Sequence, residues 1–225
     1  MSEPSVSDAL SIVKDGLTKA EKSAGRADAV TLVAVSKQQP DERIDAALAA
    51  GHRVFGENRV QEAISRWAHH RATTPDLRLH LIGPLQTNKA ADAVALFDVI
   101  EVVDRDKLAA ALAKEMKKQN RHLPCLVQVN TGEEDQKSGI SPQNTAAFVH
   151  HCQSYHGLNI TGLMCIPPAD EEPAMHFALL AKLAKTCGLS VLSMGMSGDY
   201  LEAIAFGATS VRVGSAIFGA RLPRQ

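Results

Sequence analysis

The chain has 225 residues, of which 45% are hydrophobic, and its 24 basic and 25 acidic residues leave a formal net charge of −1. This length is sufficient for one substantial core and short for two, so we expect residues 1–225 to form a single domain. The balanced charge offers no basic surface for a phosphate backbone, and no run of eighteen apolar residues occurs, so neither a nucleic-acid partner nor a membrane span is expected.

The first predicted element is an amphipathic helix, because Val6, Leu10, Val13 and Leu17 recur at helical spacing. After this helix, apolar runs rich in β-branched residues alternate with segments of helical character. The runs cover residues 31–36, 53–56, 78–83, 99–104, 125–130, 158–164, 190–195 and 209–214.

These runs predict eight parallel strands, each followed by a helix. Several are almost continuously hydrophobic, as strands covered on both faces are, and no Asn-Gly hairpin turn joins neighbours. The fold class expected is therefore α/β, a single-domain (β/α)₈ TIM barrel with an extra N-terminal helix. A doubly wound open sheet is the alternative, since alternation alone does not close a ring.

Lys37 directly follows the first predicted strand, in the segment VAVSK. Ligands of TIM barrels bind at the C-terminal ends of the strands, which places this lysine at the rim of the barrel mouth. Partial desolvation there favours the neutral, nucleophilic amine. A solvated lysine at the end of a strand is the alternative interpretation.

Two later loops carry groups that can bind an anion. Ser197 and Gly198 lie between the seventh strand and a helix that begins near Asp199, and Gly214 and Ser215 follow the eighth strand. Phosphate sites in TIM barrels often use the loops after strands seven and eight, although a simple N-cap at Ser197 is also possible. Two loops of this kind favour a phosphate-bearing ligand.

Arg212 lies two residues before Gly214 and thus on the same face of the eighth strand. If that face is the barrel interior, the guanidinium requires a partner, which could be a ligand atom or a core carboxylate. A mouth lysine, a phosphate site and an inward arginine together suggest a ligand with an aldehyde, a phosphate and a ring acceptor. Pyridoxal 5′-phosphate (PLP) has all three.

Ordered sequence blocks cover nearly the whole chain and strengthen this interpretation. They are LVAVSK (32–37), FGENRVQE (55–62), HLIGPLQTNK (80–89), QVNTGEEDQKSGI (128–140), GLMCIPP (162–168), MGMSGD (194–199) and VRVGSAIFGAR (211–221). In these blocks the chain resembles the PLP homeostasis protein family, also called YggS/PROSC. The fold of that family resembles the N-terminal domain of alanine racemase. The stretch between Pro168 and Leu192 looks shorter than is usual in the family.

The resemblance implies roles for individual residues. Lys37 would hold PLP as a Schiff base, and Arg212 would face the pyridine nitrogen. The phosphate would be held by Ser197, Gly214 and Ser215. The resemblance also places three further residues near the cofactor, namely Asn58, Met196 and His80.

The resemblance implies a PLP carrier or buffer rather than an enzyme, with PLP-dependent apoenzymes as possible recipients. An arginine donates to the pyridine nitrogen but leaves it without its own proton, so the ring is a weaker electron sink. Neither Tyr155 nor Tyr200 corresponds to the tyrosine base of alanine racemases. The alternatives are a PLP enzyme such as an amino-acid racemase or decarboxylase, and a sugar-phosphate enzyme in which Lys37 attacks another carbonyl.

Several weaker patterns complete the expectations. Lys137 is either a solvated loop charge or a second PLP contact, and Glu57 either orients groups near the mouth or pairs with Arg59. The four cysteines form no CxxC pair and the nine histidines no HExxH pattern, so no metal site is expected. No secretory signal pattern is visible at the N-terminus, and we expect a cytoplasmic monomer.

Overall fold

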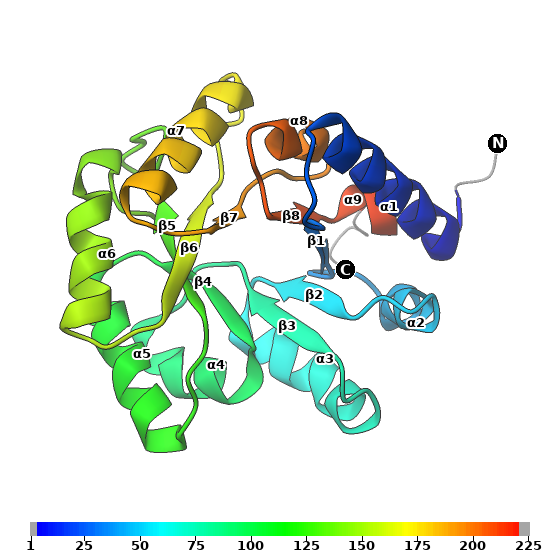
Figure 1. Cartoon of the computed structure of the whole chain (residues 1–225). Coiled ribbons are helices and arrows are strands. Elements are labelled where there is room, and N and C mark those ends of the chain that lie inside the picture. The colour runs from blue at the N-terminus through cyan, green and yellow to red at the C-terminus, as the bar shows by residue number, and fades with distance from the viewer. Residues whose placement is uncertain (1–3, 221–225) are drawn as a thin grey trace.

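Each of the eight apolar runs overlaps with one strand of the protein. The computed structural model describes residues 4–220, in which the eight strands form a closed parallel barrel in chain order (Figure 1). The strands are β1 (Thr31–Val35), β2 (Val54–Glu57), β3 (Arg78–Leu81), β4 (Val99–Val103), β5 (Cys125–Val129), β6 (Ile160–Cys165), β7 (Val191–Ser193) and β8 (Ser210–Val213).

The barrel closes where β8 pairs with β1. Ala34 of β1 is paired with Val213 of β8 on one side and with Phe55 of β2 on the other. This closure confirms the predicted (β/α)₈ barrel and excludes the open doubly wound sheet.

Helices surround the barrel on its outer side (Figure 1). They are α1 (Val6–Ser23), α2 (Asp41–Ala49), α3 (Val60–Thr73), α4 (Ala90–Leu96), α5 (Asp106–Gln119), α6 (Thr145–Ser154), α7 (Pro173–Thr186), α8 (Tyr200–Ala205) and α9 (Ser215–Phe218), with short 3₁₀ turns η1 (Thr87–Lys89) and η2 (Pro142–Asn144). None of the helices in residues 4–220 has the length and apolarity needed to cross a bilayer.

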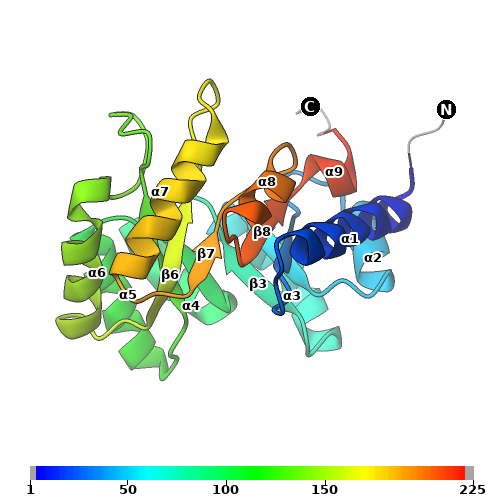
Figure 2. The same cartoon turned by 45° about the horizontal axis from the view of Figure 1, so that its top comes forward.

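The extra N-terminal helix is confirmed as α1. Its N-cap is Ser5, whose side chain accepts a hydrogen bond from the Asp8 backbone N–H, and the predicted apolar face is buried. The helix packs on α2, α8 and α9, beside the β8–β1 closure (Figure 2). The approach is close at Gly16, where a Cβ would lie 3.0 Å from the Tyr200 hydroxyl.

Most buried side chains of the barrel are aliphatic or aromatic, as a packed barrel core requires. Three charged side chains on its strands are nevertheless buried: Glu57, Glu101 and Arg212. Buried charges are costly unless they are paired and hydrogen-bonded.

Candidate functional site

A cavity of about 260 Å³ opens at the C-terminal ends of the strands. Seven of the eight residues predicted from the sequence line it: Lys37, Asn58, Met196, Ser197, Arg212, Gly214 and Ser215. They come from the ends of four strands, β1, β2, β7 and β8, and the loops that follow them, which only the closed barrel brings together. The cavity is also lined by Val35, Gln39, Ile82, Ile166, Gly198 and Gly219.

Lys37 lies in the turn that follows β1, and the backbone on both sides of it is anchored from α3. The guanidinium of Arg66 donates to the carbonyl oxygen of Ser36 at 3.0 Å and to that of Gln39 at 2.9 Å. Gln38 has a positive φ of 59°, which turns the chain within this anchored segment. The half-buried lysine is therefore held at the mouth by a fixed main chain.

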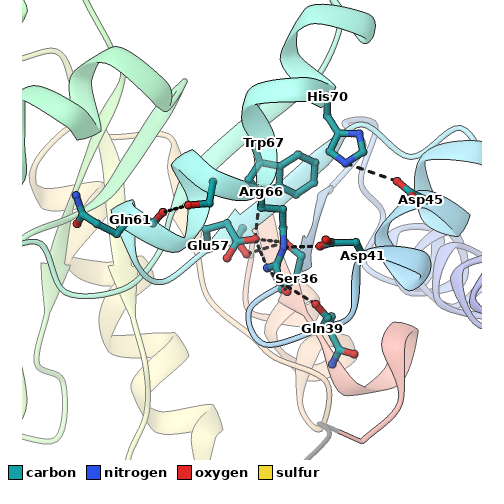
Figure 3. Close-up of polar contacts among 11 residues, drawn as sticks. Ser36, Gln39, Asp41, Asp45, Glu57, Gln61, Arg66, Trp67 and His70 are labelled. Atoms are coloured by element: carbon teal, nitrogen blue, oxygen red, sulfur yellow. Dashed lines mark hydrogen bonds and ion pairs between the residues drawn. The ribbon is translucent and has the colours of Figure 1, made fainter. Parts of the chain in front are cut away.

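The carboxylate of Glu57 is the centre of this anchor (Figure 3). Its Oε1 accepts from the Ser36 hydroxyl at 2.7 Å, from the Trp67 indole at 3.0 Å and from Arg66 at 3.1 Å. The alternative pairing with Arg59 does not occur, since Arg59 pairs with Glu62 on the surface at 3.0 Å. The reason is geometric, because Glu57 points into the protein while Arg59 points outward.

The loops after β7 and β8 meet at the hydroxyl of Ser197. Its Oγ accepts hydrogen bonds from the backbone N–H groups of Gly214 at 3.1 Å and Ala216 at 3.4 Å. These donors converge on one point beside the cavity, which is an arrangement suited to a phosphate oxygen. Gly198 adds room, because a Cβ at this position would meet no atom within 4 Å.

Asn58 supplies a polar group that the described residues do not satisfy. Its Oδ1 is buried and has no hydrogen-bond partner within residues 4–220, and the residue lines the cavity. Gly83 is what permits this position, because a Cβ there would lie only 2.5 Å from the Asn58 carbonyl oxygen. A buried amide oxygen of this kind is a group that a bound ligand can satisfy.

Arg212 is directed into the barrel and is 4% exposed. Its Nη1 donates to Ser193 Oγ at 2.6 Å, and its Nη2 donates to the carbonyl oxygen of Cys165 at 2.7 Å. Of the two partners that the sequence left open, a core carboxylate is reached through one hydroxyl, because Ser193 also contacts Glu101. A ligand atom as a partner stays a prediction, and Arg212 lines the cavity in which such an atom would lie.

The structure does not bring His80 into this cavity. His80 lines a separate cavity of about 410 Å³, together with Thr31, Val99 and Ser210 near the N-terminal ends of their strands. Its Nδ1 lies 2.6 Å from Oε1 of Glu101. The resemblance placed His80 near the cofactor, but its position in β3 directs the imidazole to the opposite end of the barrel from Lys37.

Lys137 does not line the cavity of Lys37 either. It lies in the loop after β5, where its ammonium group is 2.5 Å from a carboxylate oxygen of Glu134. A role as a second PLP contact stays a prediction.

Sequence inspection missed two features that the fold creates. Glu101 interrupts the apolar run VIEVV, and a charge inside such a run is a signal that could have identified it. The second feature is a surface cluster, in which the imidazoles of His151 and His156 lie 2.9 and 2.7 Å from the same oxygen of Asp106. These contacts hold the pKa of Asp106 below its usual value, first through the His156 hydrogen bond and then through that of His151.

Comparison with known proteins places the chain among proteins of this architecture. Residues 17–222 match the family model of the alanine racemase N-terminal domain. A pyridoxal phosphate homeostasis protein of Vibrio alginolyticus is 41% identical over 212 residues, which cover 89% of this chain and 91% of the relative.

Solved structures agree with this placement. PipY of Synechococcus elongatus without PLP superposes with a TM-score of 0.84 at 37% identity and covers 95% of this chain and 100% of its own. The same protein with PLP bound gives a TM-score of 0.81 at 36% identity, with the same coverage. The chain therefore belongs to the pyridoxal phosphate homeostasis protein family, whose barrel is that of the alanine racemase N-terminal domain.

Proposed function

We propose that this protein binds PLP in the cavity at the C-terminal ends of the strands and holds it as a Schiff base on Lys37. The observation that carries the proposal is the convergence of Lys37, the Ser197 anion site and Arg212 on one cavity. PLP requires an amine for its aldehyde, donors for its phosphate and a polar partner for its ring nitrogen. A solved relative with PLP bound, PipY, supports the same ligand.

The residues present fit each part of the cofactor. Ser197 and the backbone N–H groups of Gly214 and Ser215 would hold the phosphate, and Arg212 would face the ring nitrogen. The buried Oδ1 of Asn58 would gain a hydrogen-bond partner on the cofactor. Met196, whose side chain is 38% exposed, would cover the cofactor from the mouth of the cavity. His80 is left out of the proposed contacts because of its place in the second cavity.

We propose further that the protein stores and delivers PLP rather than catalysing a reaction. Arginine has donors only, so Arg212 can donate to an unprotonated ring nitrogen but cannot accept a hydrogen bond from a protonated one. Neither tyrosine of the chain lines the cavity, since Tyr155 lies at the end of α6 and Tyr200 packs against Gly16 of α1. A cavity without a tyrosine base is suited to reversible binding more than to racemisation.

The proposed setting is a single 225-residue domain that acts as a cytoplasmic monomer, with PLP-dependent apoenzymes as recipients. Four free thiols, three of them buried, suit a reducing compartment. Size-exclusion chromatography with light scattering tests the monomer, and a mass near 48 kDa rather than 24.1 kDa would contradict it.

The attachment residue is tested by loading the purified protein with PLP, reducing it with borohydride and mapping the adduct by mass spectrometry. We expect the adduct on the peptide that contains Lys37, and its loss together with the visible absorption band in K37A. K107A is the matched control, because Lys107 is an exposed lysine on α5. An adduct on another lysine, or an unchanged band in K37A, would contradict the assignment.

Delivery is tested by mixing the loaded protein with a PLP-dependent apo-aminotransferase in the presence of a phosphatase that destroys free PLP. Activation that resists the phosphatase supports direct transfer, and complete loss of activation contradicts it. Incubation of the loaded protein with a panel of amino acids tests the enzymatic alternative, for which multiple turnovers would be required.

A further inference from the structure

A series of four hydrogen-bonded polar side chains, three of them buried, crosses the barrel interior from one cavity to the other. Arg212 donates to Ser193, and the Ser193 hydroxyl lies 2.5 Å from Oε2 of Glu101. The other carboxylate oxygen, Oε1, lies 2.6 Å from Nδ1 of His80. The four residues belong to β8, β7, β4 and β3, so the series exists only in the closed barrel.

The chemistry of the groups fixes the direction of these hydrogen bonds. A guanidinium can only donate, so Ser193 Oγ accepts from Arg212 and has one proton left. That proton is donated to Glu101, which also accepts from the imidazole of His80. This assignment gives every link one donor and one acceptor, and it requires an ionised carboxylate at Glu101.

The neighbouring charges also support an ionised carboxylate at Glu101. Glu101 is fully buried, which by itself raises the pKa of its carboxyl, but the His80 hydrogen bond and the charges of His80 and Arg212 outweigh burial and leave that pKa below its ordinary value. The negative charge of Glu101 thus lies one hydroxyl away from the positive charge of Arg212. Each of the two buried charges compensates the other.

We infer that Glu101 is a positioning residue for Arg212: acting through Ser193, it fixes the orientation of the guanidinium at the floor of the cavity and offsets its charge. Since Arg212 is the group proposed to face the ring nitrogen, this inference rests on the proposed function. Glu101 thereby sets how tightly the ring of PLP is held and how the bound cofactor absorbs light.

The first test uses the ligand-free protein and needs no cofactor. The Arg212 Nε–Hε resonance is followed by ¹⁵N–¹H correlation spectroscopy and is assigned by its absence in R212Q. We expect it to shift or broaden in E101Q, which preserves shape but removes the charge, and in S193A, which interrupts the series. An unchanged resonance in both variants would overturn the inference.

The control for this experiment is D98N. Asp98 is a largely buried carboxylate that accepts hydrogen bonds from Arg71 and from the Leu79 backbone. Within residues 4–220, its carboxylate forms no hydrogen bond to any of the four side chains of the series. Its loss is expected to lower stability while leaving the Arg212 resonance in place. A shift in D98N as large as that in E101Q would mean that general destabilisation moves the signal, which would also overturn the inference.

The second test is a double-mutant cycle on PLP affinity and absorption. We expect E101Q to weaken PLP binding by roughly tenfold and to shift the absorption maximum of the bound cofactor, because coupled residues in one network interact measurably. In the R212Q background the same change is expected to have little further effect. Equal losses in both backgrounds would show that Glu101 acts independently of Arg212 and would overturn the inference.

The two tests separate the two proposals. Failure of the wild-type protein to bind PLP would contradict the proposed function, while the resonance of Arg212 in the ligand-free protein would still decide whether Glu101 positions it. If the wild-type protein binds PLP and the E101Q variant keeps the wild-type Arg212 resonance and PLP affinity, the positioning role alone would be overturned.

Discussion

Arg66 of α3 donates from Nη1 to the fully buried Oε1 of Glu57 at 3.1 Å, and the same guanidinium binds the carbonyl groups of Ser36 and Gln39. One ion pair thus holds the main chain on both sides of Lys37. The backbone next to Lys37 is therefore fixed by side-chain hydrogen bonds, although Lys37 itself lies in a turn.

We expect R66Q to destabilise the protein by about 3 kcal/mol, because it leaves the Glu57 carboxylate buried without its charged partner. PLP affinity is expected to fall as well, since the Lys37 turn loses two of its anchors. Urea denaturation followed by circular dichroism measures the first effect. The exposed pair Arg59–Glu62 provides the control, and R59Q is expected to change stability by no more than about 1 kcal/mol. Equal losses in both variants would contradict this account of the anchor.

Gly83 is expected to tolerate no side chain. In G83A the new Cβ would lie 2.5 Å from the Asn58 carbonyl oxygen and 2.7 Å from its Cβ, so Asn58 would have to move out of the cavity wall. Overpacking of this kind costs roughly 1–3 kcal/mol, and PLP binding should weaken in parallel. The matched variant G198A places its methyl group in open space and should keep wild-type stability within about 0.5 kcal/mol. A G83A protein as stable as G198A would contradict the prediction.

His52 is expected to make stability depend on pH. Burial is the main reason that its pKa falls from 6.5 to about 4, while its Nε2 keeps a 2.7 Å hydrogen bond to the Val54 carbonyl oxygen. Between these two pKa values the unfolded chain binds a proton that the folded protein does not. Stability is therefore complete above pH 6.5 and declines as the pH falls toward 4, by about 3 kcal/mol.

Urea unfolding of the wild type and of H52Q at pH 7 and pH 4 measures this contribution. The variant should lose about 3 kcal/mol less than the wild type over this range. H69Q is the control, because His69 is exposed on α3 and should leave the pH dependence unchanged. Parallel curves for the wild type and H52Q would contradict the assignment to His52.

The four thiols are expected to differ in reactivity. Burial raises the pKa of Cys125, Cys152 and Cys165 to about 12, and it also raises the pKa of Cys187, which is only half-buried. Because the thiolate is the reactive form, alkylation of the native protein with iodoacetamide at pH 8 should reach Cys187 first. Peptide mass spectrometry identifies the modified residue, and the other three should react only after unfolding. Early labelling of Cys165 would contradict the burial of this thiol at the end of β6, where the Cys165 carbonyl oxygen accepts from Arg212.

Much of the fold could be predicted because parallel strands carry a strong local signal. Strands covered on both faces appear as apolar runs, and all eight runs overlap with a strand, although β7 covers only Val191–Ser193 of the longer run. The rule that ligands bind at the C-terminal ends of barrel strands was enough to select Lys37, Ser197 and Gly214. Ile82 and Ile166 also follow strands at this end, so the same rule could have found these cavity residues.

The partners of the buried charges could not be predicted in this way. Pairing of Glu57 with its near neighbour Arg59 was one of two alternatives, but Glu57 pairs with Arg66, which lies further along the chain in α3. His80 was placed with the cofactor because it belongs to a shared sequence block, yet its imidazole reaches Glu101 and the other cavity. Sequence blocks record which residues recur together, whereas the direction of a side chain depends on the strand that carries it.

The sequence by itself determined the order of strands and helices, the N-terminal helix and the residues that stand at the barrel mouth, because periodicity and strand ends are local properties of the chain. Only the tertiary structure decided that β8 closes on β1, that Arg66 anchors the Lys37 turn, and that Arg212 is connected through Ser193 to Glu101. Ser193 and Glu101 are 92 positions apart in the chain, and their contact depends on the closed ring of strands that brings β4 and β7 to face each other across the interior.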